Sequence, residues 1–227
     1  MKRLHKLARL ALGGLCAAMA AAPLHAAGID IALPPPASGA SVQVFFSPDA
    51  ETDRAVARAI ADARQRVWVA GYFFTSSILA KALDQAKARG LDVRVLLDRS
   101  QVTLKYSSAT YFHNKGVPLW INARYPVMHH KFVLIDADTV GFGSMNFTRA
   151  GAQQNAENFN LFRRWPQLAS TYAKEFERLQ RESERYRPGM VFDDEGAAIP
   201  PRPWTIRTRP LPAPPQILAG CPAANAV

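Results

Sequence analysis

The chain has 227 residues, of which 48% are hydrophobic, a length and composition that suit one folded domain and exclude a disordered chain. Lys and Arg outnumber Asp and Glu by 28 to 18, giving a formal net charge of +10. This charge suits a polyanionic partner such as nucleic acid or an anionic lipid surface, although ordinary solubility explains it equally well. The two cysteines, Cys16 and Cys221, are too few for a cysteine-based zinc site.

The N-terminus has the pattern of a secretory signal peptide. An uncharged apolar run from Leu10 to Ala22 follows four basic residues, and Ala26 offers a small residue for cleavage. We predict that residues 1–26 are removed near Ala26 and that the protein is periplasmic or secreted. The run is short for a bilayer span, and an uncleaved anchor is the alternative. Cleavage would remove four basic and no acidic residues, leaving 24 against 18, a net charge of +6.

The middle of the chain predicts one α/β domain over residues 41–187, after a Pro-rich linker at 27–40. Strands are expected at 42–46, 66–74, 91–97, 117–121, 128–136, 139–144 and 158–163, and helices at 50–65, 77–89, 109–115 and 166–185. The alternation of strands and helices indicates a mixed, largely parallel β-sheet with helices on both faces. Nine of the 17 prolines lie between Pro188 and Pro222, which predicts a flexible tail at 188–227.

The residues that carry chemistry gather around the strand expected at 128–136. His129 and Lys131 are two apart and share a face of a strand, whereas Asp136 has the opposite parity and is expected to tie down a strand end. Ser144 and Asn146 follow after a glycine-rich strand. Imidazole can attack or carry a proton, while lysine, serine and asparagine can hold the oxygens of a phosphoryl group. The set does not resemble a carboxylate cage for Mg²⁺.

The pattern His129-x-Lys131-x4-Asp136, with Ser144, Asn146 and a later Glu157, resembles the HKD motif of the phospholipase D superfamily. The similarity runs from about Ser41 to Arg185, and the single motif is most similar to the bacterial Nuc-type endonucleases. The resemblance implies the phospholipase D/nuclease fold, a reaction without metal or other cofactor, and a phosphohistidine intermediate. The site residues that it implies are His129, Lys131, Asp136, Ser144, Asn146 and Glu157.

The resemblance assigns a role to each of these residues. His129 would attack phosphorus, Lys131 and Asn146 would hold the phosphate, Ser144 would support the site, and Glu157 would orient a histidine. Because the family uses two motifs per active site and this chain has one, the resemblance implies a homodimer with a shared cleft. His129 of the second chain would then be the general acid.

Several residues near the motif have other roles to which they could belong. His130 faces away from Lys131 and is expected to pack, and adjacent strand histidines are poorly placed to share a metal ion. Ser144 lacks the G-x-S-x-G context of a hydrolase nucleophile. Arg99, Lys105 and Arg149 are candidate contacts to a nucleic-acid backbone, although each is individually better explained as a solvated surface charge.

The sequence therefore favours a non-specific endonuclease acting on DNA, with RNA as a further candidate substrate. A phospholipase D acting on phosphodiester lipids is the first alternative, because the reaction centre is the same. A catalytically weak nucleic-acid-binding protein is the second, and the complete motif argues against it.

Overall fold

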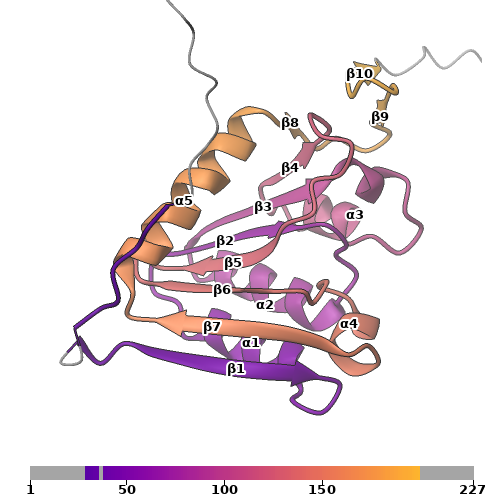
Figure 1. Cartoon of the computed structure of the whole chain (residues 1–227). Helices are drawn as coiled ribbons and strands as arrows, with labels where there is room; N and C mark the ends of the chain where they lie inside the picture. The colour runs from indigo at the N-terminus through magenta and orange to yellow at the C-terminus, as the bar shows by residue number, and fades with distance from the viewer. Residues whose placement is uncertain (1–28, 36–37, 200–227) are drawn as a thin grey trace, which may run out of the picture. The chain divides into compact units, whose positions relative to one another are not determined.

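A computed structural model describes residues 29–35 and 38–199, and its centre is one eight-stranded mixed sheet (Figure 1). The strands are β1 Ser41–Ser47, β2 Arg66–Gly71, β3 Asp92–Asp98, β4 Leu119–Asn122, β5 Lys131–Ile135, β6 Thr139–Gly143, β7 Glu157–Arg163 and β8 Glu184–Arg185. The helices are α1 Thr52–Ala61, α2 Ser77–Ala88, the 3-10 turn η2 Arg99–Val102, α3 Ala109–Asn114, α4 Arg149–Gln153 and α5 Pro166–Arg181. The strand order β1-β7-β6-β5-β2-β3-β4-β8 places β5, the motif strand, near the middle.

The mixed sheet confirms the expected fold class, but parallel pairing does not predominate. Only β2–β3 and β3–β4 run parallel within this sheet, and the pairs that β5 makes with β2 and β6 are antiparallel. The reason lies in the connections. The helices α2 and α3 return the chain for parallel pairing, whereas β5 and β6 are joined by a short turn that permits only a hairpin.

Alternate side chains of the strands pack into two separate hydrophobic cores, one on each face of the sheet. Val67, Val69 and Val133 point to the face covered by α1 and α2. Trp68 and Phe132 point to the other face, where they pack against α5. Because β2 and β5 are covered on both sides, they read in the sequence as nearly continuous apolar runs.

The long C-terminal helix is shorter than expected. It begins at Pro166, a residue preformed for a first helical turn, and ends at Arg181 instead of running to residue 185. Glu184 and Arg185 pair with β4 as the edge strand β8. The short helix α4 was not predicted. Its N-terminus is capped by Thr148, whose hydroxyl accepts a hydrogen bond from the amide of Gly151 at 2.9 Å.

The first residues of the Pro-rich tail contain a hairpin that the sequence analysis did not predict. Val191–Phe192 (β9) pairs with Ala198–Ile199 (β10) in a small hairpin. Asp193 closes the turn, since its side chain accepts from the amide of Ala197 at 2.8 Å. The predicted signal peptide, positions 27–28 and 36–37 of the predicted linker, and tail residues 200–227 lie outside the described residues. Among the described helices none has the length and apolarity needed to cross a bilayer.

Candidate active site

His129 and Lys131 lie together where the chain enters β5. His129 precedes the strand and is exposed, while Lys131 is its first residue. Nζ of Lys131 is 3.1 Å from both ring nitrogens of His129 and donates to the His129 carbonyl at 2.8 Å. An ammonium group can only donate, so this contact needs a ring nitrogen that accepts, and which of the two does so depends on the tautomer.

Lys131 is nearly buried, with 7% of its surface exposed. Burial lowers the pKa of its ammonium group, and the negative charge of Glu157 opposes that change. A cation held at the base of an exposed imidazole, with little water around it, interacts strongly with an anionic ligand. Glu157 is the first residue of β7 and Lys131 the first residue of β5, so this charge interaction acts between the starts of the two strands.

Tyr72 is part of this site, and the sequence analysis missed it. Its ring centroid is 4.8 Å from that of His129, and Nζ of Lys131 lies 5.4 Å from the centre of the same ring. The amide of Tyr72 donates to the carbonyl of His130 at 3.0 Å, which extends the β2–β5 pairing to the site. A polar aromatic residue at the end of an otherwise buried strand was the signal available in the sequence.

Ser144 and Glu157 meet at the neighbouring strand ends. The hydroxyl of Ser144 donates to Glu157 at 2.5 Å and accepts from the amide of Asn158 at 3.1 Å. The other carboxylate oxygen of Glu157 accepts from Asn155 at 3.2 Å. Glu157 is thus held by two side chains. No hydrogen bond joins Glu157 to His129 among the described residues, and its role in orienting a histidine stays a prediction.

Asn146 lies three residues after the end of β6 and has a buried side-chain oxygen. Its Oδ1 is buried without a hydrogen-bond partner among the described residues. The glycines around it permit a close approach: a Cβ on Gly143 would lie 2.2 Å from the Asn158 carbonyl oxygen, and one on Gly151 would lie 2.5 Å from that of Asn146. The backbone is therefore packed tightly around Asn146.

Asp136, although part of the motif, lies outside the site. It follows the far end of β5, where its carboxylate accepts from the amides of Arg64, Gln65 and Arg66 at 2.7 to 3.1 Å. This corrects its place among the catalytic side chains and agrees with its strand parity. Asp136 joins the start of β2 to the end of β5.

We predict that Asp136→Asn lowers the free energy of unfolding by about 2 kcal/mol, because hydrogen bonds to a charged acceptor are replaced by weaker ones. Urea denaturation measures this change. Asp138→Asn is the matched control, since the Asp138 carboxylate accepts only from Thr139 next to it among the described residues, and it should change stability by less than about 0.5 kcal/mol. If folded Asp136→Asn were as inactive as a His129 variant, the structural assignment would be wrong.

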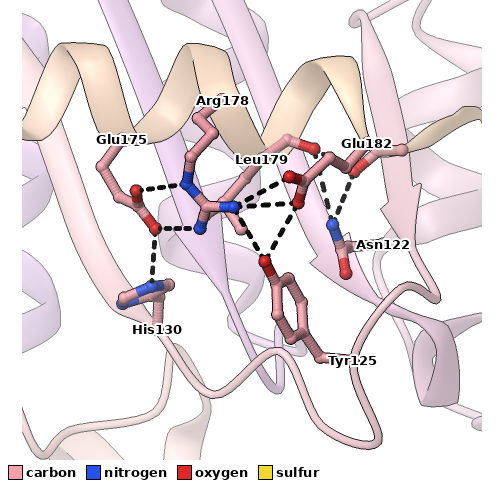
Figure 2. A network of polar contacts seen from close by, with 8 residues as sticks. Asn122, Tyr125, His130, Glu175, Arg178, Leu179 and Glu182 are labelled. Carbon is pink, nitrogen blue, oxygen red and sulfur yellow. Dashed lines mark hydrogen bonds and ion pairs between the residues drawn. The ribbon is translucent and has the colours of Figure 1, made fainter. Parts of the chain in front are cut away.

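His130 turns away from the site toward α5, as its parity predicted (Figure 2). Its Nε2 lies 3.4 Å from Glu175, which is itself held by Arg178 at 2.7 Å. Burial lowers the pKa of His130 despite the nearby Glu175, whereas hydrogen bonding from Arg178 is the main reason that the pKa of Glu175 is lowered. Arg178 continues the network to Tyr125 and Glu182. The motif strand is thereby fastened to α5.

The three residues predicted to contact a nucleic-acid backbone lie in different parts of the fold. Arg99 lines a surface hollow of about 310 Å³ together with Tyr72 and Val127. Lys105 is exposed and lies over the ring of Tyr106, 5.4 Å from its centre. Arg149 opens α4, just after Asn146, and bonds Gln153 at 3.3 Å. Arg99 is thus the one that shares a surface with a side chain touching His129.

The site combines an exposed imidazole, a buried ammonium group and neutral donors at the ends of β5, β6 and β7. Within the described part of the chain, no three His, Cys, Asp or Glu side chains gather as metal ligands would. This geometry is typical of α/β proteins that bind a phosphoryl group and attack it with a histidine.

Comparison with known proteins gives the same class. A family model described as "Cardiolipin synthase, PLD-like domain" matches residues 56–180. The chain is 33% identical to a phospholipase D of Rickettsia bellii over 121 residues, 53% of this chain and 60% of that protein. It is 29% identical to the mitochondrial cardiolipin hydrolase of Mus musculus over 150 residues, 66% of each chain.

Among solved structures, the phospholipase D family member Nuc from Salmonella typhimurium superposes with a TM-score of 0.62 at 34% identity, covering 65% of this chain and 99% of that one. NucT from Helicobacter pylori, at 19% identity and a TM-score of 0.59, supports the fold alone. The chain therefore belongs to the phospholipase D superfamily, which confirms the resemblance seen in its motif. It spans about 60% of the length of the Rickettsia phospholipases that it matches.

Proposed function

We propose that this protein is a metal-independent phosphodiesterase that cuts DNA, with His129 as its nucleophile and a second copy of the chain completing the site. The observation that carries the proposal is the contact between the exposed ring of His129 and the buried ammonium group of Lys131. It joins a nucleophile to a fixed positive charge at the place where a phosphate would sit.

The reaction would proceed in two displacements. A ring nitrogen of His129 attacks phosphorus, a P–N bond forms, and the bond to the leaving oxygen breaks as that oxygen takes a proton. Water then attacks phosphorus, breaks the P–N bond and gives up its proton. Lys131 and the amide of Asn146 stabilise the charge on the non-bridging oxygens in both steps.

The proton donor is the part that the described residues do not supply. His130 is turned toward Glu175 (Figure 2), and the hydrogen bonds and ring contacts of His129 are made with Lys131 and Tyr72. A two-fold axis beside His129 would bring a second His129 to the opposite side of the phosphate. That imidazole would protonate the leaving oxygen and later accept the proton of water.

DNA is favoured over lipid by the structural comparison, since the match to the Nuc structure covers 99% of that chain. The positive charge of the chain suits either polyanion. The curated relatives named phospholipase D and cardiolipin hydrolase support a phosphodiester lipid as the second candidate substrate. The predicted signal peptide would place either activity in the periplasm or outside the cell.

The test is to incubate purified protein with plasmid DNA, single-stranded DNA, RNA and cardiolipin vesicles, each with and without EDTA. We expect DNA cutting that persists in EDTA and is lost in His129→Ala. His113→Ala is the matched control, since His113 is exposed on α3 and contacts Tyr186.

The outcomes separate the alternatives. Lipid hydrolysis without DNA cutting would favour the phospholipase, and DNA binding without turnover on any substrate would favour a binding protein. Cutting that strictly requires added Mg²⁺ would contradict the mechanism.

A further inference from the structure

A surface hollow of about 310 Å³ lies beside the candidate active site. Tyr72 lines it, and the ring centroid of Tyr72 is 4.8 Å from that of His129. The other walls come from η2 and the residue after it, from the connection between β4 and β5, and from the β9–β10 hairpin. Tyr72 thus connects the hollow to the proposed nucleophile.

The hairpin that walls the hollow is fixed to the domain. Met190 and Phe192 pack against the hydrophobic core on the α1–α2 face of the sheet. Gly196 in the hairpin turn has a φ of +86°, and a Cβ there would overlap the carbonyl of Ala123, so the turn lies directly against the start of the β4–β5 connection. Because the same connection leads to His129, the hairpin and the nucleophile are held by one segment of chain.

The hairpin lies outside the part of the chain that defines the family. The matched family domain ends at residue 180, whereas β9 begins at Val191. The hollow therefore combines a side chain of the family domain, Tyr72, with a wall that follows that domain.

The lining of the hollow suits a flat, uncharged ring better than a phosphate. Val127 is 47% exposed, and Pro126 and Phe192 add apolar surface. Asp193 and Asp194 would repel a phosphate, but a carboxylate can accept a hydrogen bond from the exocyclic amine of a base. The volume lies at the lower end of the range of about 300–1,000 Å³ for ligand pockets, which suits a single small ring system.

We propose that the hollow holds one unstacked nucleobase next to the phosphate that His129 attacks, and that the protein therefore cuts single-stranded DNA in preference to duplex. This inference rests on the proposed function. A base in a duplex is stacked and paired, so it would have to leave the helix to enter the hollow, an unfavourable step that a single strand avoids. Arg99 lines the same hollow and supplies a positive charge for a flanking phosphate.

A single-stranded oligonucleotide of deoxycytidine with one abasic position in its middle tests the base site. Separating the products by length gives the cutting rate at every linkage of the same strand. One linkage beside the abasic position should be cut about tenfold or more slowly than the others, because base–aromatic stacking is lost there. Equal cutting at all linkages by the wild-type protein would overturn the proposal.

Val127→Trp fills the hollow from an exposed position, so the melting temperature should stay unchanged. Overall cutting should slow about tenfold or more, and the linkage beside the abasic position should no longer differ from the rest. Gly196→Val is the second variant, since it would displace the hairpin turn from Ala123 and should weaken the same difference. Ile199→Trp is the matched control, because Ile199 is 43% exposed and lies on the same hairpin, away from the residues that line the hollow.

The preference between strands gives an independent measurement. Single-stranded circles should be cut about tenfold or more faster than relaxed duplex circles of the same sequence. Equal rates would overturn the base site and leave the phosphodiesterase standing. A protein that cuts no DNA but hydrolyses cardiolipin would overturn the proposed function as well. If Val127→Trp slowed cardiolipin hydrolysis but not DNA cutting, the hollow would be a lipid-headgroup site, against the proposal.

Discussion

Mixed dimers of wild-type and His129→Ala chains are expected to be inactive, so activity should fall with the square of the wild-type fraction. Both imidazoles are needed for one turnover, since one forms the P–N bond while the other supplies the proton. Chains refolded together at equal amounts should therefore show about one quarter of the wild-type activity. The His129→Ala protein alone should lose roughly 10⁴-fold or more, as expected when a covalent nucleophile is removed.

This measurement needs subunits that have exchanged fully. Co-refolding from denaturant achieves this, and plasmid cutting under single-turnover conditions provides the rate. Mixtures of wild-type and His113→Ala chains should keep full activity, which would show that refolding itself does not reduce activity. A linear dependence on the wild-type fraction would mean that each chain works alone, and the shared site would have to be abandoned.

Replacing Lys131 by Met should inactivate the protein and at the same time stabilise it. Activity is expected to fall about 10²- to 10³-fold, the usual cost of losing one group that stabilises transition-state charge. Stability should rise because burial lowers the pKa of Lys131, so its charged form is less favourable in the folded than in the unfolded chain. Met keeps the aliphatic stem without that cost.

The sign of the pH dependence follows from the direction of the shift. The folded state binds the Lys131 proton more weakly than the unfolded chain does, so this group destabilises the fold at neutral pH. Its contribution becomes less unfavourable as the pH rises from the lowered pKa toward the unfolded value of 10.5. The gap in melting temperature between Lys131→Met and wild type should thus be widest near pH 7 and narrow near pH 10.

Thermal denaturation at the two pH values measures this gap, and Lys81→Met is the control because Lys81 is exposed on α2. A Lys131→Met protein that melts below wild type at pH 7 would show that the hydrogen bonds of the amine outweigh its desolvation.

Much of the candidate site could be predicted because its chemistry is concentrated in one strand and two strand ends. Strand parity placed His129 and Lys131 together, and it set Asp136 apart before its backbone contacts were seen. Such local periodicity is strong where both faces of a strand are buried. Tyr72 could not be predicted in the same way, since only the antiparallel pairing of β2 with β5 brings it to His129.

The remaining differences have the same origin in long-range contacts. Glu175 meets His130 across 45 positions of sequence, which no local pattern encodes. The end of α5 at Arg181 is decided by the pairing of β8 with β4, although the helical pattern continues to residue 185. The alternation of strands and helices in the first half of the chain predicted a largely parallel sheet. The later strands β5 and β6 instead form an antiparallel hairpin, which that alternation does not indicate.

The first strand of the domain pairs with a strand that is synthesised much later. Ser47 pairs with Glu157, and more than one hundred residues separate β1 from β7. Closing so long a loop is entropically unfavourable until the intervening strands are in place, so β1 must remain undocked while most of the chain emerges. The finished sheet therefore cannot form until β7 has been synthesised, so a partial polypeptide that ends before Glu157 exposes the edge of β6 that β7 would cover.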